Sequence, residues 1–137
     1  MNGLGRLGGS LVDLNVRVLL IGLLVGGCAS MKSEPPTPIT SMSQIEGKWQ
    51  GTITLGFNGP MELYWLTIQP DGSFEAQYGM NWQWGNVTLN NGAATFDITA
   101  PGPSSGSLVY YAGPPAPSLS LNATFGGWSA QVKPTTR

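Results

Sequence analysis

The chain has 137 residues, of which only 9% are charged, and it contains 20 glycines and 11 prolines. Roughly a quarter of the residues are charged in an ordinary soluble domain, so this composition favours short strands joined by turns. The net charge is −1 and histidine is absent, which argues against nucleic-acid binding and against a histidine base or metal ligand. A single cysteine excludes an intrachain disulfide. We therefore expect no cofactor, no metal and no nucleic-acid partner.

Residues 1–27 are predicted to be a secretion signal. Two arginines precede the apolar run 18–25, which is too short to cross a bilayer as a helix. The run ends in Val25-Gly26-Gly27-Cys28, which resembles the lipobox of bacterial lipoproteins. The resemblance implies cleavage after Gly27 and a diacylglyceryl anchor on Cys28, which would hold the protein at a membrane of the cell envelope. The alternative is an ordinary signal peptide with a free Cys28.

Residues 28–44 are predicted to be a flexible tether between this anchor and one domain at 45–137. The segment is polar, contains prolines and shows neither helical nor strand periodicity. Ala29 and Ser30 follow the cysteine without an aspartate retention signal. If the source is a diderm bacterium, the sorting rules of the lipoprotein family imply the outer membrane.

From Ile45 onward apolar residues recur at every second position, which predicts β-strands. Leu119, Leu121, Ala123 and Phe125, for example, alternate with polar residues. Turn signals such as Pro70-Asp71-Gly72 and Asn91-Gly92 separate the strands. About eight strands are expected, at 47–55, 61–69, 73–80, 83–89, 93–99, 106–112, 118–124 and 128–133.

The connections between these strands are all short, which favours an antiparallel meander over parallel crossovers. Eight consecutive strands have no exposed edge if the first pairs with the last. The fold class we predict is therefore all-β, a single small antiparallel up-and-down barrel. A flattened β-sandwich of the same meander is the alternative.

Gly47-Lys48-Trp49 lies at the start of the first expected strand. It resembles the Gly-x-Trp signature of lipocalins and their calycin relatives. That resemblance implies an eight-stranded barrel in which Trp49 plugs one end, so Gly47 and Trp49 have structural roles. The barrel interior is expected to be filled by aromatic core residues, with a cavity for a small hydrophobic ligand as the alternative. The expected core aromatics are Trp49, Phe74, Phe96, Phe125 and Trp128.

Two groups of apolar residues differ from this core pattern. The expected strands 61–69 and 106–112 are apolar on both faces, so one face of each must point outward, as a partner-binding patch or as a docking surface for the tether. Four residues with the same parity, from Tyr78 to Trp84, are core if they point inward. If they point outward, they are suited to stack on sugar rings or to bind another protein. The candidate binding surface comprises Leu63, Trp65, Val109, Tyr111, Trp82 and Trp84.

Catalysis is not expected from the acidic residues. Glu46, Glu62, Glu75 and Asp97 lie at strand ends or polar-face positions, and none has a second acid beside it in the sequence. The function we predict is a noncatalytic envelope module that binds a protein or a glycan. The alternatives are a lipocalin-like carrier of a small hydrophobic ligand and an inhibitor of lysozyme or of a protease. Residues 106–110 resemble, loosely, the Ser-Gly-x-x-Tyr motif of membrane-bound lysozyme inhibitors.

Overall fold

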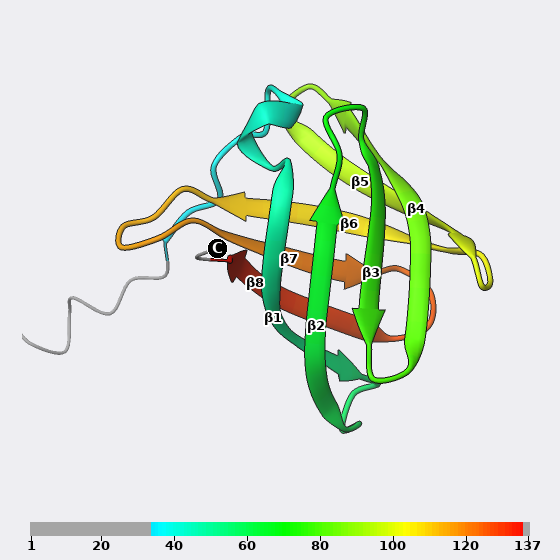
Figure 1. Cartoon of the computed structure of the whole chain (residues 1–137). Helices are drawn as coiled ribbons and strands as arrows, with labels where there is room; N and C mark the ends of the chain where they lie inside the picture. The colour runs from blue at the N-terminus through cyan, green and yellow to red at the C-terminus, as the bar shows by residue number, and fades with distance from the viewer. Residues whose placement is uncertain (1–33, 136–137) are drawn as a thin grey trace, which may run out of the picture. The chain divides into compact units, whose positions relative to one another are not determined.

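Eight antiparallel strands close into one barrel in the computed structural model, which describes residues 34–135 (Figure 1). Each strand pairs with the next one along the chain, and β1 also pairs with β8, so the barrel has no edge strand. This confirms the all-β up-and-down barrel rather than the sandwich. The elements are η1 (Met42–Gln44), β1 (Gly47–Leu55), β2 (Met61–Ile68), β3 (Ser73–Tyr78), β4 (Asn81–Asn90), β5 (Ala93–Ala100), β6 (Ser104–Tyr111), β7 (Ser118–Ala123) and β8 (Trp128–Pro134).

The predicted signal sequence, the lipobox and Cys28 lie outside the described residues. Within residues 34–135, no helix has the length and apolar character needed to cross a membrane. The same residues hold no group of three or more acidic, cysteine or histidine side chains placed to bind a metal ion.

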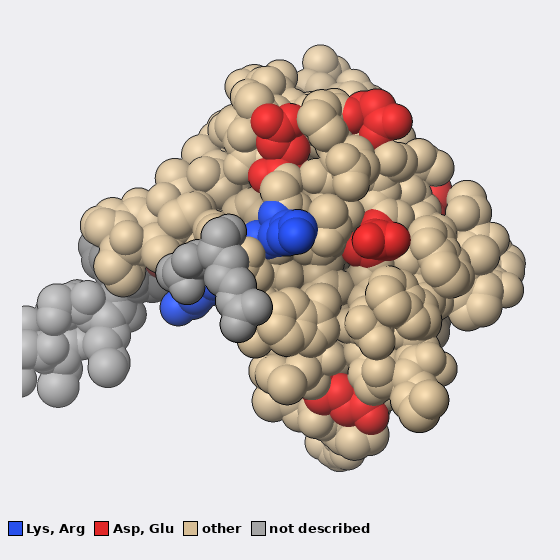
Figure 2. All heavy atoms as spheres, in the orientation of Figure 1, with Lys and Arg blue, Asp and Glu red and all other residues tan. Residues whose placement is uncertain are grey.

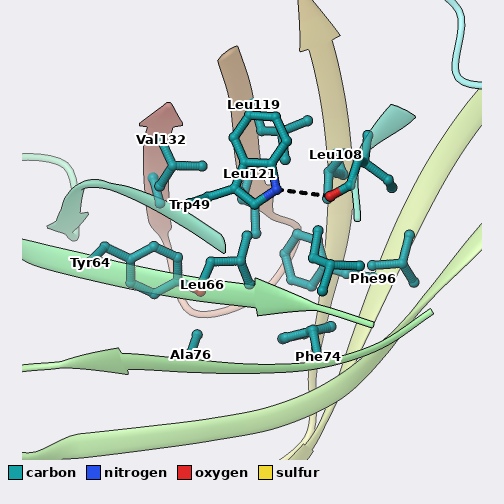
Figure 3. Packing of buried hydrophobic residues seen from close by; sticks show 14 of the residues in the cluster. Trp49, Tyr64, Leu66, Phe74, Ala76, Phe96, Leu108, Leu119, Leu121 and Val132 are labelled. Carbon is teal, nitrogen blue, oxygen red and sulfur yellow. Dashed lines mark hydrogen bonds between the residues drawn. The ribbon is translucent and has the colours of Figure 1, made fainter. Parts of the chain in front are cut away.

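The alternating apolar residues of the strands point into the barrel and fill it. Tyr64, Leu66 and Ile68 on β2 are buried, as are Leu119 and Leu121 on β7. Figure 3 shows the buried side chains of several strands converging on the barrel interior. Because outward and inward residues alternate along each strand, this core also fixes which side chains the strands present to solvent.

One polar pair lies within this apolar interior. The Tyr64 hydroxyl donates a hydrogen bond to the Gln83 side-chain oxygen at 3.2 Å, and both residues are buried. Burial raises the pKa of Tyr64 well above its ordinary value, with a smaller contribution from Tyr78 nearby. The hydroxyl therefore stays protonated and available as a donor, which satisfies the buried amide oxygen.

Turn chemistry sets two of the hairpins. Asn91 and Gly92 have φ angles of 51° and 82° between β4 and β5, as the predicted Asn-Gly turn requires. Between β2 and β3, the Asp71 carboxylate accepts hydrogen bonds from the Ser73 hydroxyl at 2.6 Å and the Ser73 backbone N–H at 2.9 Å. These bonds lower the pKa of Asp71 below its usual value. The two turn predictions are confirmed.

The end of the expected tether is part of the domain. The Thr37 N–H donates to the Tyr110 carbonyl at 2.7 Å, the Ile39 N–H donates to the Gly92 carbonyl at 2.9 Å, and Ile39 is buried. The pairing of β5 with β6 ends at Ala94 and Leu108, and Thr37 pairs with β6 two residues further on, at Tyr110. The compact unit begins at Pro35. The assignment of residues 28–44 to a flexible tether is therefore corrected for residues 37–44, and residues 28–33 lie outside the described part.

Trp49 is buried among the core residues at the start of β1, where the Gly-x-Trp resemblance placed a plug. Its indole N–H donates to the Ile45 carbonyl at 2.8 Å, drawn as the dashed line in Figure 3. Gly47 has a φ of 114°, a conformation that side chains with a Cβ rarely adopt. Glycine at this position therefore lets the chain turn from η1 into β1 and place the indole inside.

Phe125 is the one expected core aromatic that the structure does not bury. Its side chain is 71% exposed. The prediction was wrong because β7 ends at Ala123, so Phe125 lies in the loop before β8 and the strand alternation no longer applies to it. Other large exposed apolar residues occupy hairpin loops at the same end of the barrel: Phe57 between β1 and β2, and Met80 between β3 and β4.

Candidate functional site

Three tryptophans point outward on two strands that flank β3. Trp65 on β2 is 46% exposed, and Trp82 and Trp84 on β4 are 43% and 46% exposed. The Trp82 and Trp84 rings are nearly parallel, with centroids 6.2 Å apart and planes inclined by 14°. Trp49 and Trp128, the two other tryptophans, are buried. All the outward tryptophan surface of the barrel is thus gathered over β2 to β4.

The turn between β3 and β4 explains why Trp82 and Trp84 point outward. Tyr78 and Asn81 are directly opposite each other across the two-residue turn Gly79–Met80, and opposite residues in an antiparallel pair lie on the same face. Inward positions are therefore even-numbered on β3 and odd-numbered on β4. Tyr78 and Trp82 are both even-numbered, but they lie on opposite faces of the sheet because the turn comes between them. The alternative in which Trp82 and Trp84 are core residues is wrong.

The strand register places five outward residues in one line across five strands. Gln50 on β1 lies opposite both Lys133 on β8 and Trp65 on β2, Trp65 lies opposite Gln77 on β3, and Gln77 lies opposite Trp82 on β4. We call Lys133, Gln50, Trp65, Gln77 and Trp82 the Trp65 row. Strands are about 4.8 Å apart, so the row extends roughly 19 Å over the outside of the barrel.

The surface along the Trp65 row is hollowed in two places. A cavity of about 520 Å³ lies over β1 to β4, and its lining includes Trp65, Trp82, Gln77 and Gln50. A second cavity, of about 400 Å³, lies over β1, β8 and β7, and Gln50 lines it as well. Its other outward side chains are mainly polar: Thr52, Ser118, Ser120, Gln131 and Lys133, together with Tyr111 of β6. Because Gln50 lines both cavities, they are neighbours along the row.

The floor of the first cavity is polar. Gln77 is half-buried between the more exposed Trp65 and Trp82, and Thr67, also half-buried, lies two residues after Trp65 on the same face of β2. Glu75, which lies opposite Thr67 and Trp84, is exposed at the margin. The Gln77 side-chain nitrogen donates a long hydrogen bond of 3.4 Å to the Gly79 carbonyl, which leaves its amide oxygen without a bond to the described residues. This surface therefore combines flat aromatic faces with amide and hydroxyl groups able to bond a ligand.

Charged groups are few on this face. Within residues 34–135, Lys48 and Lys133 are the only basic residues, and each lines one of the two cavities. Figure 2, in the orientation of Figure 1, shows basic and acidic groups as separate spots on a surface that is mostly uncharged. Both lysines lie beside Gln50, one on the same strand and one opposite on β8.

The outside of the barrel over β5 to β7 has a different character. Its exposed positions include Thr95, Asp97 and Thr99 on β5 and Ser107 on β6. Asp97 lies opposite Asn86 and Ser105, so no second acid faces it across the sheet. Small polar side chains of this kind offer little surface for a ligand to bury.

The six candidate surface residues do not form a single patch. Leu63, which is 60% exposed, lies next to Trp65 in a cavity of about 460 Å³ with Glu62 and Gln77. Tyr111 belongs to the second cavity along the row. Val109 instead lines a cavity of about 310 Å³ together with residues 36–39. The N-terminal segment therefore lies beside the end of β6 and shares a cavity with Val109.

Sequence reasoning missed the polar members of the site. Lys48 and Gln50 alternate with the buried Trp49, so their outward orientation is readable from the sequence. Their proximity to Trp65 and Lys133 depends on the register between strands that are distant in sequence, which no local pattern encodes.

Comparisons of the chain with protein-family models, with curated proteins and with solved structures gave no match. The eight-stranded antiparallel barrel is consistent with a lipocalin-like fold. The side chains that this barrel displays are therefore what indicates its function.

Proposed function

We propose that the protein is a noncatalytic binding module of the bacterial cell envelope, held at a membrane by lipid on Cys28, which binds a protein or glycan partner along the Trp65 row. One observation carries the proposal: the half-exposed Trp65 and Trp82 line the same cavity, and this cavity shares Gln50 with a second one. Half-exposed tryptophans are costly to keep in water and are typical of recognition surfaces. In a diderm source the membrane would be the outer membrane.

The barrel interior supports this proposal better than it supports a carrier. Nineteen buried apolar residues within 34–135 form one core cluster, among them Phe96 and Trp128 with ring centroids 5.4 Å apart. The cavities described above are lined by outward side chains of the row or by the N-terminal segment. A carrier needs an apolar space inside the barrel, whereas the hollows found here suit a ligand bound on the outside.

The anchor is tested by replacing the lipidated residue. Cys28→Ala removes the sulfur that the lipobox resemblance assigns to diacylglycerol, and two or three acyl chains make membrane release negligible. We expect the wild-type protein in the membrane fraction and the variant in the soluble fraction after cell breakage and ultracentrifugation. Membrane association that persists in the variant would contradict the lipid anchor.

Photocrosslinking in cells that make the protein tests the binding surface. Trp84 lies beside the Trp65 row without lining its first cavity, so a photoreactive p-benzoylphenylalanine at position 84 reports on the row while leaving its residues intact. The matched control carries the same amino acid at position 95, which is exposed on β5. We expect an adduct from position 84 and none from position 95.

The mass of the adduct, and its sensitivity to protease or to glycosidase, identify the class of partner. Equal labelling at the two positions, or no labelling at position 84, would contradict a partner bound along the row.

A further inference from the structure

We infer that the ligand of the Trp65 row is a glycan chain that carries acidic groups, with sugar rings against Trp65 and Trp82 and an anionic group between Lys48 and Lys133. The inference rests on the proposed function, because it names the class of ligand that this same surface binds.

The alternation of side chains along the row matches the two faces of a sugar. A sugar ring presents C–H groups on its flat face, which pack on an aromatic ring, and hydroxyls at its edge, which need donors and acceptors. Tryptophan faces in the row alternate with Gln50 and Gln77, whose amides both donate and accept. Half-buried Thr67 adds a hydroxyl to the floor of the first cavity. Each tryptophan therefore has a polar neighbour placed to bond the edge of a ring that stacks on it.

The length of the row suits a chain rather than a single small molecule. The row crosses five strands, roughly 19 Å, and the two cavities along it have volumes of about 520 and 400 Å³. Tyr111, opposite Ser118, adds an aromatic ring at the far end of the second cavity. Successive units of one polymer are able to occupy both cavities.

The distribution of charge indicates an acidic group on that chain. Lys133 lies opposite Gln50, and Lys48 precedes Gln50 by two residues on the same face, so the two lysines are diagonal neighbours about 7–8 Å apart at the backbone. They are the only basic residues within 34–135. Glu75 faces the row from β3, two strands from Lys48. It disfavours an anion at the tryptophan end of the row and accepts hydrogen bonds from sugar hydroxyls.

Other polymers fit this surface less well. A nucleic acid carries a charge on every nucleotide, and six acidic residues outnumber two lysines within residues 34–135, so a continuous polyanion is repelled. The core of a protein interface is largely apolar, whereas amides separate Trp65 from its cross-strand neighbours in the row, and its exposed apolar neighbour is Leu63 on the same strand. A sugar chain with spaced acidic groups avoids the repulsion of a continuous polyanion, and its hydroxyls can bond the amides that lie between the tryptophans.

Isothermal titration calorimetry of the full chain, purified in detergent, tests the inference. The carboxylate probe is a hyaluronan octasaccharide, the phosphate probe is a phosphorylated core oligosaccharide released from lipopolysaccharide, and the neutral probe is chitohexaose. We expect one of the acidic probes to bind about tenfold more tightly than chitohexaose at low salt, and this advantage to shrink as salt is raised. Which acidic probe binds more tightly identifies the source of the anion.

Matched variants locate the binding. Trp65→Ala and Trp82→Ala should each weaken binding of the acidic probe by about tenfold or more, since truncation of a central aromatic commonly has this effect. Trp84→Ala is the control, because Trp84 is equally exposed and stacks beside Trp82 but does not line the cavity; its effect should be much smaller. Changing both lysines to glutamine should abolish the difference between the acidic and neutral probes. Circular dichroism melting curves check that each variant is folded.

Several results would overturn the inference. They are equal binding of acidic and neutral probes, equally tight binding of a single-stranded DNA of the same charge, and Trp65→Ala binding as well as wild type. A protein adduct at position 84 combined with no oligosaccharide binding overturns the glycan inference and leaves the proposed function standing. Absence of both the adduct and oligosaccharide binding overturns both.

Discussion

Replacing Phe96 by alanine is expected to lower the free energy of unfolding by about 3 to 5 kcal/mol. Phe96 on β5 is 0% exposed; its ring contacts Phe74 edge-on, with centroids 6.5 Å apart, and lies 5.4 Å from the Trp128 ring. On the neighbouring strand, a Cβ added to Gly106 would lie 2.7 Å from the Phe96 ring. The ring therefore fills space that a glycine leaves open, and the rigid barrel backbone cannot close the cavity when the ring is removed.

Urea unfolding followed by circular dichroism measures this loss. Phe125→Ala is the matched control, because it deletes the same side chain at a position that is 71% exposed, and it should change the free energy of unfolding by less than about 0.5 kcal/mol. Equal effects of the two substitutions would mean that Phe96 is not in the core.

The second large effect is expected from Trp49→Ala, also about 3 to 5 kcal/mol. Two contributions add at this site. The buried indole fills one end of the core, and its N–H satisfies the Ile45 carbonyl at 2.8 Å. Trp49→Phe separates them, because it keeps most of the apolar volume and removes the donor; it should cost about 1 to 3 kcal/mol, the penalty for an unsatisfied buried acceptor.

The same urea titration, applied to both Trp49 variants, gives the two free energies. If Trp49→Phe destabilises the domain as much as Trp49→Ala does, the hydrogen bond to Ile45 dominates and the plug role is wrong. If neither variant is destabilised, the burial of Trp49 itself is contradicted.

The strands and their turns could be predicted because they depend on local patterns. Alternation along β7 and the Asn91-Gly92 turn each involve a few consecutive residues, and both are found where the sequence indicated. Alternation fails where a strand stops, which is why Phe125 was misplaced. Across a two-residue turn the inward positions also change from even to odd residue numbers. The orientation of Trp82 therefore stayed open until the pairing of Tyr78 with Asn81 was known.

The candidate site was predicted in its aromatic part only. Trp65 stands out in the sequence because the strand that carries it is apolar on both faces, so that one of the faces has to point outward. Trp82 stands out only as a member of a run of large apolar residues of the same parity. Gln50, Gln77 and Lys133 do not stand out, since polar residues are ordinary on an outer face. They become part of one site only through the register of β8, β1, β2 and β3, and register between strands far apart in sequence is a property of the closed barrel.

The N-terminal segment was mistaken for tether because prolines and serines dominate its composition. Ile39 is the residue that attaches it to the core. One apolar side chain and two backbone hydrogen bonds in a polar stretch produce no hydrophobic periodicity, so the sequence pattern does not indicate that this segment is ordered. Ser41 and Gln44 form a capping box at η1, in which they satisfy backbone groups reciprocally; this Ser-x-x-Gln pattern is the one sequence signal that could have indicated an ordered element before Ile45.

The attachment at Thr37 determines how the domain responds to mechanical load. A pull on the chain from residue 34 acts first on the pairing of Thr37 with Tyr110, then on the buried side chain of Ile39, and on β1 only after η1 has unwound. We therefore expect residues 37–46 to detach before any strand of the barrel is lost, and these ten residues span at most roughly 33 Å when extended. A stretched chain lengthens while the Trp65 row keeps its shape.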